Sequence, residues 1–158
     1  MISALENLAG PGRPLRAEPP DAKEFAGLQR SGLARLTDAV QPGLSVEGRF
    51  DLAYNAAHAL CLAALRWHGY RSSNRFIVFQ LLPHTLGLGP EVWRVLSKGH
   101  DIRNLGEYEG DLNVDANRYR PCRGLPKSSR QIGRVGADNI VMNSALSLLI
   151  CSNSAKLQ

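Results

Sequence analysis

The sequence predicts an all-α protein, folded as an antiparallel bundle with short connections. Between residues 22 and 110, apolar side chains recur at helical spacing in several long segments. Pro and Gly interrupt these segments at intervals, and neither β-branched alternation nor an Asn-Gly hairpin signal occurs in the same region. Because 158 residues correspond to about one domain with a substantial core, we expect a single helical domain at residues 22–115.

The segment at residues 1–21 is rich in Pro and Gly and is expected to be a leader with a short helical turn near residues 3–8. Asp21 is a candidate N-cap for a helix over residues 22–40, and a Gln-Pro-Gly sequence at 41–43 ends that helix. Its apolar residues are Phe25, Leu28, Leu33, Leu36 and Val40.

A second helix is expected over residues 46–68, with Ser45 before it and Glu47 in its first turn. Gly69 is a natural residue to follow its end. Its many alanines permit close approach of a neighbour, so it is predicted to be the central helix. The apolar stripe comprises Phe50, Tyr54, Ala57, Cys61, Ala64 and Leu65.

A third helix is predicted to begin at Ser72 or Ser73 and to be kinked or ended by Pro83. A Gly- and Pro-containing turn at 87–90 leads into a fourth helix over residues 90–108, before Gly110. The apolar residues of the two helices are Phe76, Phe79, Leu82, Leu86, Trp93 and Leu96.

The fourth helix becomes polar toward its end, where helical steps from its apolar residues lead to His100, Arg103 and Glu107. One interpretation is an Arg103–Glu107 ion pair near solvent, because a buried Arg is unfavourable unless paired. The other is a polar cleft lined by Arg103, Asn104 and Tyr108.

The second helix offers a polar counterpart, since Tyr54, Asn55 and His58 lie within about one turn of an otherwise apolar segment. A single histidine in such a helix is more often a core residue than a catalyst. Whether His58 lies near the fourth helix does not follow from the sequence.

Three segments, FDLAYNAAHALCLAAL, GYRSSNRF and HDIRNLGEYEG, resemble the HEPN domain family of small helical proteins. The family includes partners of prokaryotic nucleotidyltransferases and RNase toxins. The motifs span about residues 50–115, and the helix over 22–40 fits the family's length pattern. The resemblance implies a four- to five-helix bundle, commonly dimeric, with a polar cleft near the dimer interface.

Catalytic members of the family carry Arg and a polar residue followed by a His about four to six residues later, and they cleave RNA without a metal. Arg103 and Asn104 match the first half, but residues 108–111 (Tyr-Glu-Gly-Asp) stand where that His would fall. Without the imidazole, no obvious general acid or base remains for attack by a ribose 2′-hydroxyl. The resemblance therefore favours binding over cleavage.

The leading hypothesis is a HEPN-like homodimer that binds RNA or a nucleotide, with a nucleotidyltransferase of a toxin–antitoxin or stress-response system as a candidate partner. The alternatives are a metal-independent ribonuclease that uses His100 or His58, and a non-catalytic dimeric interaction module. The candidate ligand-binding residues are Arg103, Asn104, Tyr108, His100, His58 and Tyr54.

Composition excludes several classes of protein. Apolar residues make up 44% and charged residues 21% of the chain, which excludes collagen, a coiled-coil rod and a wholly disordered chain. No apolar run reaches the roughly 18 residues of a membrane span, and the first residues lack the features of a signal peptide, so a cytoplasmic protein is expected. We expect no metal or cofactor, because the widely spaced cysteines fit no zinc or redox pattern: Cys61, Cys122 and Cys151.

The net charge of +5 is concentrated at one end of the sequence. Residues 1–115 carry 12 Lys and Arg against 13 Asp and Glu, whereas residues 116–158 carry 7 against 1. A role of the helical domain in nucleic-acid binding must therefore depend on local residues rather than on a basic face.

Residues 116–158 are expected to form an irregular tail, because Pro121 and Pro126 interrupt its basic part. An Arg-rich segment of this kind can bind RNA, although a solvated segment is the more usual role. The apolar stretch at 139–151 is too short to span a membrane. Since the HEPN resemblance ends near residue 115, one hypothesis is a replaced or frame-shifted C-terminus.

Overall fold

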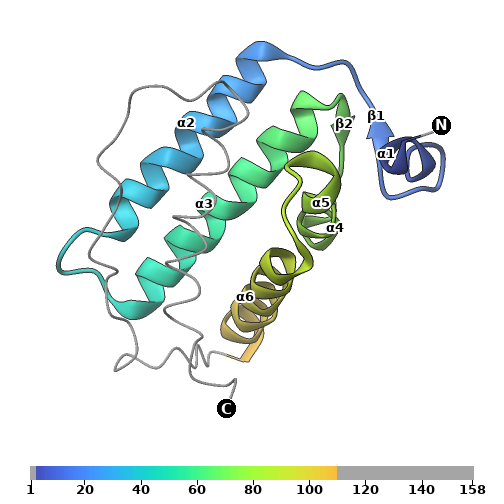
Figure 1. Cartoon of the computed structure of the whole chain (residues 1–158). Helices are drawn as coiled ribbons and strands as arrows, with labels where there is room; N and C mark the ends of the chain where they lie inside the picture. The colour runs from blue at the N-terminus through green and yellow to red at the C-terminus, as the bar shows by residue number, and fades with distance from the viewer. Residues whose placement is uncertain (1–2, 110–158) are drawn as a thin grey trace.

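A computed structural model describes residues 3–109, which are mostly helical (Figure 1). Within this range there are six helices and one two-stranded sheet, so the prediction of a predominantly α-helical protein is confirmed. The elements in chain order are α1 Ala4–Asn7, β1 Arg16–Ala17, α2 Ala22–Ala39, α3 Val46–Trp67, β2 Tyr70–Arg71, α4 Arg75–Gln80, α5 Leu82–Thr85 and α6 Pro90–Glu109.

Capping contacts confirm the predicted starts of the two long helices in the first half of the chain, α2 and α3. The Asp21 side chain accepts a hydrogen bond from the backbone N–H of Glu24 at the start of α2. The Ser45 hydroxyl accepts one from the backbone N–H of Gly48, at 3.0 Å, at the start of α3. Each bond satisfies an N–H that has no partner within its helix.

The third predicted helix is wrong in its start, whereas the predicted interruption near Pro83 is confirmed. It begins at Arg75, two to three residues later than predicted, because Asn74 is the N-cap and its Oδ1 accepts hydrogen bonds from the N–H groups of Phe76 and Ile77. As predicted, the helix does not continue through Pro83, since α4 ends at Gln80 and a second short helix, α5, contains Pro83. Pro83 lacks an N–H and fits the first turn of a new helix better than the interior of a continuing one.

The expectation that residues 22–110 contain no strand is also wrong. Strand β2 pairs antiparallel with β1, with Arg16 opposite Arg71 and Ala17 opposite Tyr70. A strand of two residues is too short to show alternation, so the pattern used for the prediction could not reveal it.

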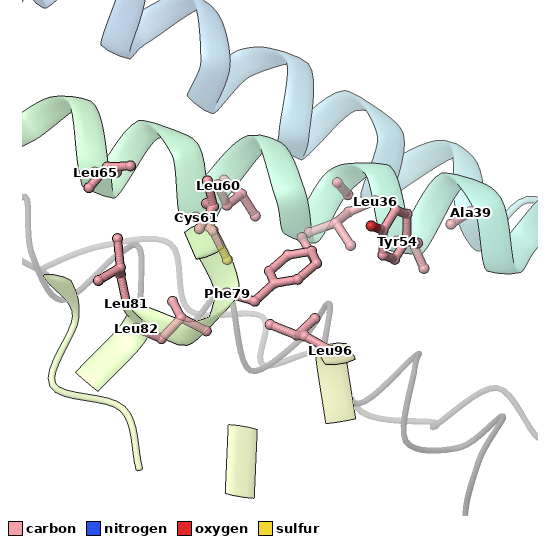
Figure 2. Close-up of a cluster of buried hydrophobic side chains, with 14 of the residues drawn as sticks. Leu36, Ala39, Tyr54, Leu60, Cys61, Leu65, Phe79, Leu81, Leu82 and Leu96 are labelled. Carbon is pink, nitrogen blue, oxygen red and sulfur yellow. The ribbon is translucent and has the colours of Figure 1, made fainter. Parts of the chain in front are cut away.

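Helix α3 is the central element, as its alanines predict. It contacts α2 along one side and α4, α5 and α6 on the other (Figure 1). The close approach of α2 depends on Gly32, where a Cβ would lie 2.8 Å from Cγ of Leu60. On the other side, Phe79 of α4 and Leu96 of α6 face the buried side chains of α3 (Figure 2).

The first residues of the described range pack onto this core. Leu5 and Leu15 are buried and belong to the same hydrophobic cluster as the side chains of α3. The backbone N–H of Glu18 donates to the carbonyl of Gly69, at 2.9 Å, beside the paired strands. The segment before α2 is therefore held against the end of α3.

A network of charged side chains anchors the same segment. Arg66 is only 1% exposed, and its Nε donates to Glu24 at 2.9 Å. It also donates to the carbonyl oxygens of Glu18 and Pro19 at 3.2 and 2.9 Å. Arg71 completes the network through bonds to both Glu18 and Glu24.

The predictions for Gly110 and for the tail at 116–158, with Cys122 and Cys151, lie outside the described residues. In the part that is described, no helix is long and apolar enough to cross a membrane.

Candidate functional site

Tyr54 is the centre of the candidate site and joins α3 to α6. Its side chain is fully buried, and its hydroxyl lies 2.8 Å from Nδ1 of His100. The other ring nitrogen of His100, Nε2, lies 3.1 Å from the Asn104 amide nitrogen. When that amide donates to Nε2, the ring proton is on Nδ1 and is donated to the Tyr54 oxygen. One chain of hydrogen bonds thus connects three of the predicted residues.

Two aromatic side chains of α4 pack against these hydrogen-bonded residues. The ring of Phe79 meets that of Tyr54 edge to face, with centroids 5.7 Å apart, and the two rings lie together in Figure 2. Phe76 lies 6.0 Å from the His100 ring. Apolar surroundings of this kind weaken competition from water and fix the orientation of the polar groups.

Arg103 lies above the Tyr54 ring, with its guanidinium carbon 5.5 Å from the ring centroid. Its side chain is 20% exposed and forms an ion pair with Glu107 one turn later, so the predicted Arg103–Glu107 pair is present. Its Nε also lies 3.5 Å from a carboxylate oxygen of Asp51 on α3. The ion-pair interpretation of this residue is therefore confirmed, while the polar cleft remains a prediction.

His58 lies one turn after Tyr54 on α3, and its ring meets Phe79 edge to face at 5.9 Å. Burial first, and then the positive charges of Arg75 and Arg103, lower the pKa of His58 from 6.5 to about 4. At neutral pH the ring is therefore uncharged. It resembles a core histidine more than a proton donor.

Tyr108 does not join these residues. Its side chain is 86% exposed, and the contacts within residues 3–109 do not connect it to Tyr54 or His100. Helix α6 places it beyond Asn104, toward solvent. We call the other five predicted residues the Tyr54 cluster: Tyr54, His58, His100, Arg103 and Asn104.

Sequence reasoning missed Arg75, the first residue of α4. Its Nη1 donates to Oδ1 of Asn55 at 3.3 Å, and the Asn55 amide nitrogen donates to the carbonyl of Asp51 at 2.8 Å. Burial raises the pKa of Tyr54, while the charge and hydrogen bond of Arg75 oppose that rise. The polar Asn55 within an apolar helix was the available signal, but nothing in the sequence pointed from it to Arg75.

The side chains of the Tyr54 cluster offer hydrogen-bond donors and acceptors and one positive charge. Among residues 3–109, no group of three or more His, Cys, Asp or Glu side chains is placed to hold a metal ion. The thiol of Cys61 is fully buried in the core, which raises its pKa. The arginines, the amide and the imidazole are groups that bind phosphate oxygens and base edges.

Comparison with models of known protein families gives no match, and neither do comparisons with curated proteins and with solved structures.

Proposed function

We propose that this chain is a HEPN-like protein that binds RNA or a nucleotide at the Tyr54 cluster, in an antiparallel bundle of four to five helices. The observation that carries the proposal is the 2.8 Å contact between the Tyr54 hydroxyl and Nδ1 of His100. It joins the segment FDLAYNAAHALCLAAL to the segment HDIRNLGEYEG, which are two of the three motifs behind the resemblance.

In this proposal Arg103 contacts a phosphate group. Its guanidinium offers paired donors that match two phosphate oxygens. The carboxylate of Glu107 is about half exposed, so a bound anion displaces it into water without burying an unpaired charge. Asn104 binds a base edge or orients the ligand, and the exposed Tyr108 stacks on a base.

Binding without cleavage fits the histidines better than ribonuclease activity does. Cleavage through a ribose 2′-hydroxyl needs a base and an acid within reach of the substrate. His58 is a weak base with a pKa of about 4, and both ring nitrogens of His100 have hydrogen-bond partners. We therefore expect no cleavage when the protein is incubated with RNA in EDTA.

The test uses the full chain and a fluorescently labelled single-stranded RNA, with affinity measured by anisotropy. We expect Arg103→Ala to weaken binding by about tenfold or more, the usual effect of losing a charge-assisted hydrogen bond. Arg94→Ala is the matched control, because Arg94 lies on α6 but is exposed and outside the cluster. Equal binding by wild type and Arg103→Ala would remove Arg103 from the site.

The same variant separates this proposal from an interaction module. We propose a homodimer, with a nucleotidyltransferase as a candidate partner. If the Tyr54 cluster serves only to stabilise the dimer, Arg103→Ala will shift the monomer–dimer equilibrium in sedimentation experiments and leave RNA affinity unchanged.

A further inference from the structure

Arg75 differs from Arg103 in having no acidic partner among residues 3–109. Arg103 pairs with Glu107 and Asp51, whereas no carboxylate of the described residues forms an ion pair with Arg75. The hydrogen-bond partners of Arg75 are neutral: the amide of Asn55 and the hydroxyl of Tyr54.

The Arg75 guanidinium lies in surroundings that are unfavourable for a positive charge. Arg75 is partly buried, and its charge and that of Arg103 both act on His58. Both positive charges lower the pKa of the His58 imidazole, while the carboxylates of Asp51 and Glu107 form ion pairs with Arg103. A partly buried guanidinium without a counter-ion is unfavourable, and an anion would relieve it.

Asn55 holds the Arg75 side chain in place. Its amide nitrogen is bound to the carbonyl of Asp51, so its Oδ1 is the group that faces the guanidinium. The guanidinium has five N–H donors, so its bonds to Asn55 and Tyr54 leave others for a ligand with several acceptor oxygens. A phosphoryl group has this chemistry.

We propose that Arg75 is the principal phosphate-binding residue of this site, and that its ligand is the phosphoryl group of a nucleotide or of an RNA backbone. The ligand class rests on the function proposed above; the anion-binding role rests on the contacts of Arg75 itself. Arg103, already paired, is then the second cation that the ligand meets.

The experiment uses two probes on the full chain. Inorganic phosphate is titrated while the arginine side-chain N–H signals are followed by NMR, and labelled single-stranded RNA is titrated by fluorescence anisotropy. Arg75→Gln removes the charge. Arg75→Lys keeps the charge but loses the planar fork, and Arg94→Gln is the control.

We expect Arg75→Gln to weaken binding of both probes by about tenfold or more, Arg75→Lys to have a smaller effect, and Arg94→Gln to change neither by more than about twofold. Thermal melts establish that each variant is folded. Should Arg75→Gln fail to fold, the NMR titration of the wild type decides, and phosphate binding that leaves the Arg75 side-chain signals unshifted then overturns the assignment.

The outcomes separate the two proposals. If wild type and Arg75→Gln bind RNA and phosphate equally, the assignment of Arg75 is wrong and the RNA-binding function stands. If wild type binds phosphate through Arg75 but does not bind RNA, the anion site stands and the RNA-binding function falls. If wild type binds neither probe, both are overturned.

Discussion

Replacing Arg66 by Met should strongly destabilise the protein, because Arg66 is the buried link between α3 and the segment that precedes α2. The guanidinium bonds to Glu24 and to the carbonyl oxygens of Glu18 and Pro19. A Met side chain fills much of the same space but donates nothing, so the carbonyl oxygens of Glu18 and Pro19 lose this donor and Glu24 keeps only its bonds from Arg71.

The expected magnitude follows from this geometry. Breaking a buried ion pair by removing one partner costs about 3–5 kcal/mol. The carboxylates of Glu18 and Glu24 are about 30% exposed and can recover water, which lowers the expected loss in the free energy of unfolding to about 2–4 kcal/mol. A loss of this size lowers the Tm by roughly 10 °C in a chain of this length.

The assay is urea denaturation followed by circular dichroism, with Arg16→Met as the matched control. Arg16 also pairs with Glu18, but its side chain is 72% exposed, so its loss should cost less than about 1 kcal/mol. Hydrogen exchange gives a local readout at the N–H of Glu18, which bonds to Gly69. If Arg66→Met is as mild as Arg16→Met, the proposed anchoring is wrong.

Three further outcomes are expected. Gly32→Ala should lower the urea midpoint, because its Cβ would lie 2.8 Å from Cγ of the buried Leu60. The cost of overpacking, about 1–3 kcal/mol, exceeds the gain of about 1 kcal/mol in helix propensity, so a raised midpoint would contradict this close approach. Tyr54→Phe should cost about 1 kcal/mol and shift the His100 ring-nitrogen signals in NMR, whereas unchanged signals would argue against their hydrogen bond. Hydrogen bonds, first from Arg71, lower the pKa of Glu18 from 4.5 to about 2, so its contribution to the free energy of unfolding is complete above pH 4.5 and is lost as the pH falls toward 2. Glu18→Gln should flatten this dependence of the free energy of unfolding on pH, and an unaltered slope would contradict the assignment.

The long helices were predictable because their signals are local. Asp21 and Ser45 are N-caps within the same few residues as the helices they begin, and the apolar stripes of α2 and α3 repeat over many turns. Strand β2 has two residues, so its pairing depends on β1 more than fifty residues earlier. No local pattern could have revealed it.

The sequence indicated which residues of α6 lie together at the candidate site, but not how they connect to α3 and α4. His100, Arg103 and Asn104 are neighbours on one helix, so the sequence places them together. The contact between Tyr54 and His100 joins residues 46 positions apart and depends on how α3 and α6 pack. Arg75 was missed for the same reason, since its partner lies 20 positions away on α3.

The most direct test of the proposed function is an NMR titration of the full chain with single-stranded RNA, with the histidine and arginine side chains observed. We predict that the side-chain signals of His100, Arg103 and Arg75 shift together and saturate at one RNA concentration. Shifts confined to residues 116–158, with these three side chains unchanged, would contradict the account.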